Sequence, residues 1–154
     1  MKLKKEIISF LGKQGFTVVS TIGADGYPHN SCKGIVRIDE EKIYLIDLYT
    51  GKTRANLKDN PHIAITAVDE HSFRGFCIKG RAREINEDEI PPDMAEDWKK
   101  KIHGRIVTRI VNSVRGRKGH PSHPEALMPG PKYIIEVDVE KIIDLAPVKN
   151  NPED

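Results

Sequence analysis

Residues 49–61 read YTGKTRANLKDNP, and they carry the chain from a strand into a short helix. The run before them, 42–48, is strand-like, and the segment from Lys52 onward is compatible with a helix until Asn60-Pro61 stops it. The first backbone N–H groups of a helix have no partner inside it, and the helix dipole places partial positive charge there. A strand that leads into a helix start therefore favours an anion, above all phosphate.

Side chains at this start strengthen the prediction of a phosphate site. Lys52 adds a full positive charge, Thr53 adds a hydroxyl donor, and Gly51 lacks the Cβ that would keep a phosphate away from the backbone. The alternative is a short surface helix with a polar start, because Gly-Lys-Thr without the earlier glycine of a P-loop is a weak motif. From these residues alone, both interpretations stay open.

Length and composition predict one globular domain. The chain has 154 residues, of which 38% are hydrophobic and 31% charged. We expect residues 1–147 to form a single domain and 148–154 to be a frayed tail. No apolar run is long enough to span a membrane. The basic and then apolar residues 1–15 are interrupted by Glu6 and Lys13 and lack a cleavage site, which predicts a helix and a cytoplasmic protein.

The cysteines and histidines do not form a metal-binding pattern. Cys32 and Cys77 lie outside any CxxC motif, and we expect both to be free buried thiols. His103, His120 and His123 lack the spacing of helical or knuckle ligands, so we predict no metal site.

A basic block lies late in the chain. Between Trp98 and Lys118 there are eight lysines and arginines and no acidic residue. Three interpretations stay open: a solvated helix face, a surface that attracts a phosphorylated reductant or substrate, or a nucleic-acid-binding surface.

Alternating apolar residues and turn signals predict a mainly β fold. We predict strands at 16–22, 28–38, 42–48, 62–68, 76–85 and 132–145, an early helix ending near Gly12, a short helix from Lys52, and a long one over 94–114 capped by Asp93. Turns rather than helices join most strands, which excludes a parallel βαβ sheet and favours a closed or nearly closed, six-stranded antiparallel barrel with flanking helices. Strand 42–48 should be covered on both faces, and Gly80 should mark a bulge.

This order of elements resembles the FMN-binding split-barrel family, which includes pyridoxamine phosphate oxidase and small FMN-binding proteins. The resemblance rests on DGYPHNS, IYLID, GKTRANLKDNPHIAI and FCIKGRARE, and it covers residues 7–85 and, more loosely, 132–146. The Lys-Thr, Asn-Leu and Asn-Pro run before an apolar strand is its most specific part. The resemblance implies a Greek-key split barrel.

The resemblance also implies FMN in a groove at a homodimer interface. The Lys-Thr pair would hold the phosphate, the strand after the first hairpin would lie along the ring system, and the residues before the helix would line the ribityl chain. The implied cofactor-binding residues are Asn30, Ser31, Cys32, Lys33, Tyr49, Thr50, Gly51, Lys52 and Thr53. Tyr49 could equally be a half-buried barrel tyrosine, and Arg54 either contacts the phosphate or points to solvent.

The strand expected to lie along the ring, 28–38, carries two cations. Lys33 and Arg37 are predicted to share one face of their strand, either beside the flavin, where a cation stabilises the anionic reduced ring, or as an exposed pair.

Some residues depart from pyridoxamine phosphate oxidase. The Arg-x-x-Leu-Leu-Lys strand and the C-terminal arginine-histidine motif are both missing, and strand 30–38 reads NSCKGIVRI instead. We therefore do not expect vitamin B6 oxidation. In the proline-rich loop 115–132, His120 and His123 are candidate proton donors beside the flavin of a partner subunit.

The function predicted from the sequence is an FMN-dependent oxidoreductase that takes two electrons from a reduced nicotinamide and acts on a small substrate. The alternatives are a flavin carrier or redox sensor, and a basic nucleic-acid-binding barrel. Whether a haem or a deazaflavin replaces FMN stays open.

Overall fold

The computed structural model describes residues 1–47, 51–114 and 133–146, with side chains of the third helix described only up to Gly104. Its strands are β1 (Thr17–Ile22), β2 (Pro28–Ile38), β3 (Lys42–Asp47), β4 (His62–Asp69), β5 (Arg74–Asn86) and β6 (Tyr133–Asp144). Its helices are α1 (Lys5–Gly12), α2 (Lys52–Asp59) and α3 (Pro92–Val114), with a 3-10 turn, η1, at Glu87–Glu89. Among these residues no helix is both long and apolar enough to cross a bilayer.

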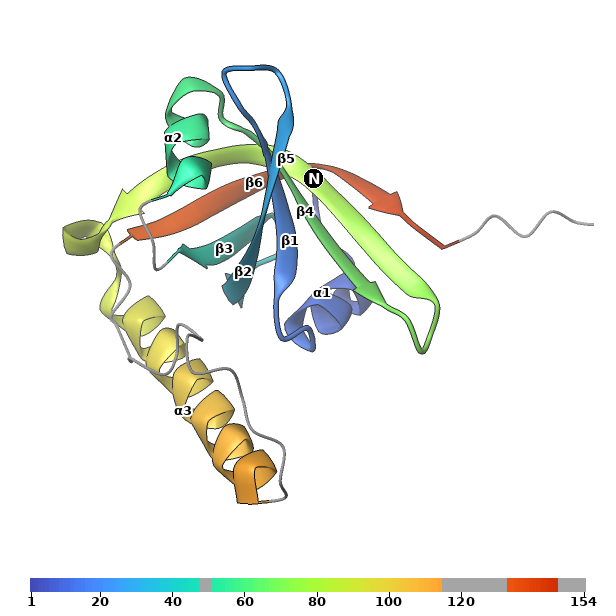
Figure 1. Ribbon diagram of the computed structural model, residues 1–154, viewed down its shortest axis with the longest axis vertical. Coiled ribbons are helices and arrows are strands. Elements are labelled where there is room, and N and C mark those ends of the chain that lie inside the picture. Colours follow the sequence, from blue (N-terminus) through green and yellow to red (C-terminus); the bar gives the residue numbers. More distant parts are fainter. Residues whose placement is uncertain (48–50, 115–132, 147–154) are drawn as a thin grey trace, which may run out of the picture.

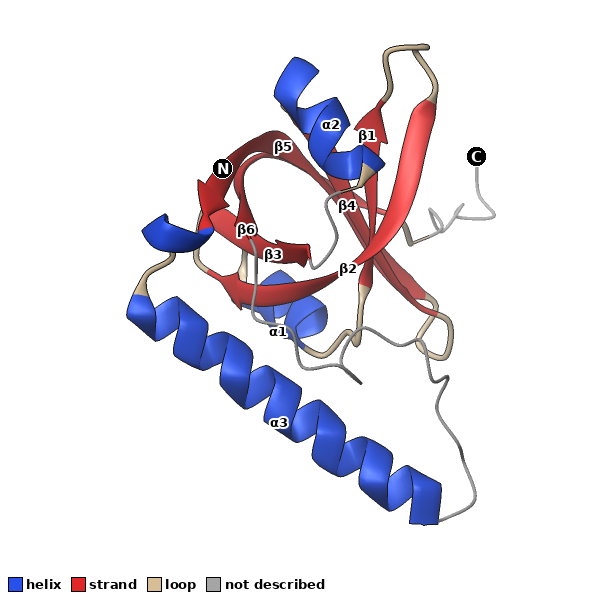
Figure 2. Ribbon diagram, turned by 60° about the vertical axis from the view of Figure 1, so that its left-hand side comes forward, coloured by secondary structure: helices blue, strands red, loops and turns tan. Residues whose placement is uncertain are grey.

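The strands close into an antiparallel barrel in the order β1-β2-β3-β6-β5-β4 (Figure 1). The predicted six-stranded, mainly β barrel is thus confirmed, with strand ends within two residues of those expected. β3 and β4 follow one another in the chain but are not neighbours in the ring, so the connection between them must cross one end of the barrel. This crossing carries α2, which Figure 2 shows beside the opening at that end.

α1 covers the opposite end. Its stripe residues Ile7 and Leu11 are buried with the preceding Leu3, and Phe10 packs edge-on against Phe76 at the start of β5. These side chains join the main apolar cluster inside the barrel. The predicted stripe of the early helix is therefore confirmed.

A second apolar cluster lies between the barrel wall and α3. Met94, Trp98 and Ile102 of α3 pack against outward-facing residues of the wall, among them Ile46 and Ile134. This helix covers the outer side of β3, which explains why the strand is buried on both faces, as predicted. α3 begins at Pro92, so Asp93 lies in its first turn and is not the predicted cap.

Two β-bulges shape the wall. The predicted one at Gly80 is confirmed by a register shift between Lys79 and Gly80, where a Cβ would lie 2.0 Å from the Asp138 carbonyl oxygen. The second lies between Ile35 and Arg37 of β2 and was not predicted.

The bulge in β2 makes one prediction wrong. Because an extra residue shifts the inward and outward alternation, Lys33 faces the barrel interior whereas Arg37 faces outward and pairs with Asp97 of α3. The two cations therefore do not share a face.

The cysteines and the basic block differ in part from expectation. Both cysteines are free thiols, but neither is fully buried: Cys32 is exposed, because it lies on the outer face of β2, and Cys77 is half-buried. In the basic block, Lys99 pairs with Glu96, and the Lys101 ammonium donates to the Ile35 carbonyl. The side chains from Arg105 onward lie outside the described part.

Candidate functional site

α2 is fastened to the barrel by polar side chains. Thr53 and Asn56 are its buried residues. The hydroxyl oxygens of Thr53 and Ser31 on β2 lie 2.9 Å apart, and the Asn56 amide donates to the Thr21 hydroxyl of β1 over 3.0 Å. The start of the helix is therefore held directly above the first half of β2.

The start of α2 is open and carries no acidic residue in its first turn. Gly51 has an extended backbone that any residue could adopt, and a Cβ there would meet no described atom within 4 Å. Neither the backbone nor packing within the described chain requires glycine here, so the free space suits a ligand. The exposed Lys52 and the unpartnered first N–H groups of a helix make this corner suitable for phosphate.

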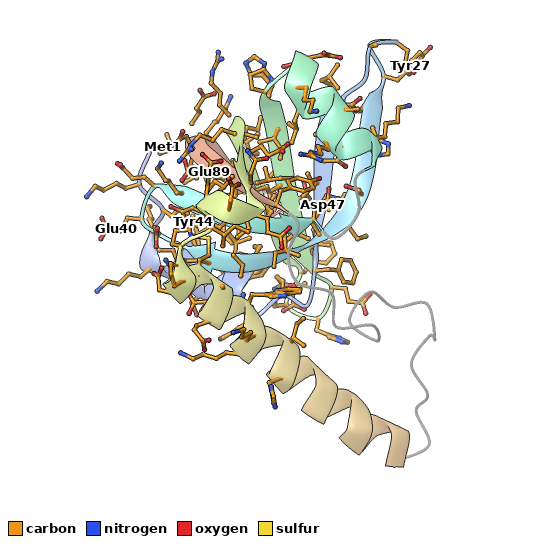
Figure 3. The ribbon with its side chains drawn as sticks, turned by 90° about the vertical axis from the view of Figure 1, so that its left-hand side faces the viewer. Met1, Tyr27, Glu40, Tyr44, Asp47 and Glu89 are labelled. Carbon is orange, nitrogen blue, oxygen red and sulfur yellow. The ribbon has the colours of Figure 1, made fainter. Side chains whose placement is uncertain are left out.

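A charged cluster lies inside the barrel beneath this corner. The Lys33 ammonium pairs with the Asp47 carboxylate over 2.8 Å, and both side chains are buried. The Tyr133 hydroxyl donates to the same carboxylate from the neighbouring strand. Burial, reinforced by the negative charge of Asp47, raises the pKa of Tyr133 well above its usual range, so this phenol stays protonated. Figure 3 shows Asp47 within the barrel body, whereas Tyr27 projects from the β1–β2 turn.

An ion pair closes the other side of the same barrel end. Arg54, in the first turn of α2, donates two hydrogen bonds to Glu84 of β5. Its guanidinium lies 4.7 Å from the centre of the Tyr133 ring. The hydrogen bond from Arg54 lowers the pKa of Glu84. The sequence left open whether Arg54 contacts the phosphate or points to solvent. Its contact with Glu84 of β5, on the far wall of the barrel from β2, was not among these interpretations.

A cavity of about 200 Å³ lies under α2 on this side. It is lined by Arg54, Leu57, Lys58, Ala82, Arg83, Glu84, Tyr133 and Ile135. This side of the barrel end is thus partly open, with both charged and apolar side chains in its lining. In the described residues no group of three or more histidine, cysteine, aspartate or glutamate side chains is arranged to hold a metal ion.

The family model described as pyridoxamine 5'-phosphate oxidase matches residues 3–146. The chain belongs to this family. The match covers both the corner at α2 and the barrel, and it confirms the resemblance drawn from the sequence.

Solved structures agree with the family at the level of the fold. HupZ of Group A Streptococcus is 23% identical, with a TM-score of 0.66 and coverage of 94% of each chain. An F420 reductase is 17% identical, with a TM-score of 0.60 and coverage of 92% of this chain and 98% of that one. A Clostridium acetobutylicum protein related to general stress protein 26 is 17% identical, with a TM-score of 0.57 and coverage of 92% of each chain. A comparison of this chain with curated proteins found no match.

Within this family fold, the residues predicted to bind the cofactor separate into groups. Ser31, Lys33 and Thr53 come together at the polar end of the barrel, and Gly51 and Lys52 lie exposed at the helix start beside them. Asn30 and Cys32 lie on the outer face of β2. Tyr49, Thr50, His120 and His123 lie outside the described residues.

Asp47, Glu84 and Tyr133 were not among the predicted site residues. A signal existed for Asp47, because it follows Ile43 and Leu45 in the inward phase of its strand, where a carboxylate needs a buried partner. Glu84 and Tyr133 carried a similar signal, because Glu84 follows Ala82 and Tyr133 precedes Ile135 in the inward phase of their strands. Their partners could not be predicted, since these contacts join distant segments.

Proposed function

We propose that the chain is an FMN-binding flavoprotein and an FMN-dependent oxidoreductase of its family. The observation that carries the proposal is the contact between the Thr53 and Ser31 hydroxyls. This contact joins the start of α2, which suits a phosphate, to β2, the strand that is expected from the family resemblance to lie along the flavin ring. In this arrangement Lys52 and the first N–H groups of α2 hold the phosphate, and Thr53 and Ser31 align it with β2.

Bound FMN would supply two-electron chemistry, with a reduced nicotinamide as donor and a small molecule as acceptor. The residues of this chain bind and orient it. The phosphate corner, formed by Lys52 and the first N–H groups of α2, would supply affinity far from the flavin ring. Asn30 and Cys32 on the outer face of β2, with the backbone of that strand, would lie along the ring. His120 and His123 remain candidate proton donors from a partner subunit.

We also propose that the protein is a homodimer whose second copy covers the ring. The outward-facing residues of β1 and β4 include no lysine, arginine, aspartate or glutamate: they are Val18, Ser20, Ile22, His62, Ala64, Thr66 and Val68. Phe16 and Val68 are large exposed hydrophobic residues at the edge of this face. Val18 pairs in register with Cys32, so the face continues onto the outer side of β2. Such a patch is typical of protein interfaces.

A charge placed on this face tests the dimer. Sedimentation velocity should show a dimer for the wild type and a monomer for Val68→Lys. Asp88→Lys changes the charge on the exposed turn η1 and should leave the dimer intact. A wild type that sediments as a monomer would remove this part of the proposal.

The phosphate corner is tested by comparing FMN with riboflavin, which lacks the phosphate. We expect Lys52→Ala to weaken FMN binding about tenfold, as for the loss of one charge-assisted contact, and to leave riboflavin binding unchanged. Lys5→Ala removes the same charge from the exposed first turn of the other eight-residue helix, α1, and serves as the matched control. Quenching of flavin fluorescence gives the affinities. Equal affinity of the wild type for both ligands would contradict the proposal.

Enzyme activity needs a separate experiment. We expect the FMN-loaded protein to lose the visible absorbance of oxidised flavin when it is mixed anaerobically with NADH or NADPH. Loaded protein that keeps its colour with both donors would remove the nicotinamide-dependent oxidoreductase and favour a flavin carrier.

A further inference from the structure

The orientation of α2 depends on its side-chain contacts. The helix has eight residues, too few to be stable alone in water. On one side, Thr53 and Asn56 fasten it to Ser31 and Thr21 on strands β2 and β1. These contacts hold one edge of the helix, and a second point of attachment is needed to fix its tilt across the barrel.

Arg54 provides the second attachment, on the opposite wall. Its Nε donates to Glu84 Oε2 over 2.8 Å, and its Nη2 donates to Oε1 of the same carboxylate, so the pair is bidentate. The guanidinium also lies over the ring of Tyr133. Because a bidentate arginine contact fixes direction as well as distance, it constrains the helix more than a lysine contact would.

The far wall is itself held in place by the buried cluster. Tyr133 donates to Asp47, and Asp47 pairs with Lys33 on β2, two residues after Ser31. The contacts therefore form a continuous chain from the first turn of α2 to β5 and β6, through β3, and back to β2. Each strand that surrounds the corner takes part in setting the direction of the first helical N–H groups.

We infer that Arg54 is a positioning residue that, through Glu84 and Tyr133, aims the start of α2 at the phosphate and so selects phosphorylated flavin over riboflavin. This inference rests on the proposed function. The Arg54 charge is already matched by Glu84, so its main contribution to the corner is geometric. Backbone N–H groups bind an anion well only over narrow ranges of distance and angle, and a tilted helix start would lose several such contacts together.

Two variants, one that changes the net charge and one that keeps it, separate geometry from electrostatics. Glu84→Gln removes a negative charge and frees Arg54, so a purely electrostatic role predicts tighter FMN binding. Arg54→Lys keeps the positive charge but loses the bidentate contact. If Arg54 acts by positioning, both variants should weaken FMN binding about tenfold and change riboflavin binding less than about twofold, as expected for the loss of a hydrogen bond to a charged group.

Glu87→Gln, on the exposed turn just after β5, is the matched control for the change of charge. Fluorescence titrations of the full chain with FMN and riboflavin give the ratio of affinities, and thermal unfolding checks that each variant folds. Equal or tighter FMN binding by Glu84→Gln would overturn the positioning role. An equal loss of affinity for FMN and riboflavin in the two variants would also overturn it, because general destabilisation would weaken the binding of both ligands alike. A wild type without preference for FMN would instead overturn the proposed function, and this inference with it.

Discussion

The two ends of the barrel are covered by helices of equal length and opposite character. α1 and α2 each have eight residues. α1 covers its end with the apolar side chains Ile7 and Leu11, which merge with the main core. α2 covers the other end mainly through hydrogen bonds and an ion pair, above the buried Lys33–Asp47 contact, and Leu57 adds an apolar contact with the core.

This difference separates the stability of the barrel from the orientation of its groups. Apolar burial is strong but non-directional, so the α1 end can hold the barrel closed without fixing any single contact. Hydrogen bonds and ion pairs contribute less net free energy and depend steeply on geometry. A barrel end that must present backbone groups to a ligand therefore gains from polar contacts, whereas the apolar end needs no such precision.

The largest effect is expected at the polar end, where the contrast is most easily broken. Asp47→Asn leaves the buried Lys33 ammonium without its counter-charge and should lower the free energy of unfolding by about 4 kcal/mol. Urea denaturation measures this loss. The double variant Lys33→Met/Asp47→Leu removes both charges and should be clearly more stable than Asp47→Asn. If the single variant were as stable as the wild type, the buried pair would not matter for the fold.

A core substitution at the other end comes next. Leu11→Ala opens a cavity in the apolar end and should cost about 3 kcal/mol, measured by the same denaturation. Ser9→Ala on the exposed side of α1 should change the stability by less than about 0.5 kcal/mol. Leu11→Ala should leave the ratio of FMN to riboflavin affinity unchanged. A changed ratio would show that the two ends are not independent.

The same contrast explains how much the sequence could predict. Strand ends, the α1 stripe and the bulge at Gly80 depend on local alternation, turn residues and a glycine within a strand, and all of these were predicted. The bulge between Ile35 and Arg37 follows Gly34, a glycine within β2 that was not interpreted as a bulge marker, so the prediction that Lys33 and Arg37 share a face was wrong.

The candidate site was predictable in part for the same reason. The helix start at Gly51 to Thr53 follows from consecutive residues. The Asp47–Tyr133 contact joins strands that are 86 positions apart in the chain, and the Arg54–Glu84 pair joins positions 30 apart. Contacts of this kind depend on strand order and register, which one sequence does not specify.

A smaller effect is expected at the contact between α2 and β2. Thr53→Val keeps the shape of the side chain but loses the hydroxyl contact with Ser31, and should lower the stability by about 1 kcal/mol. Thr53→Ser keeps a hydroxyl and should retain most of the stability. FMN binding should weaken more in Thr53→Val than in Thr53→Ser. If the two variants bound FMN equally, the hydroxyl would have no part in the site.

The smallest effect is one of pH, and it distinguishes the two ends most directly. The hydrogen bond from Arg54 holds the pKa of Glu84 below its usual value of 4.5. Because the folded-state pKa is the lower one, the contribution of this pair is present above pH 4.5 and is lost as the pH falls through the folded-state pKa. Glu84→Gln should therefore be less stable than the wild type by about 0.5 kcal/mol at pH 7, as for a partly exposed pair, and this difference should disappear in acid.

Leu11→Ala is the control for this titration, because no ionisable group is removed. Its loss of stability should stay the same across the range in which the Glu84→Gln difference disappears. Denaturation curves at matched ionic strength from neutral to acid pH give both differences. A Glu84→Gln difference that stayed constant with pH would show that the pair contributes through packing rather than charge. The polar end would then stabilise the barrel in the same way as the apolar one.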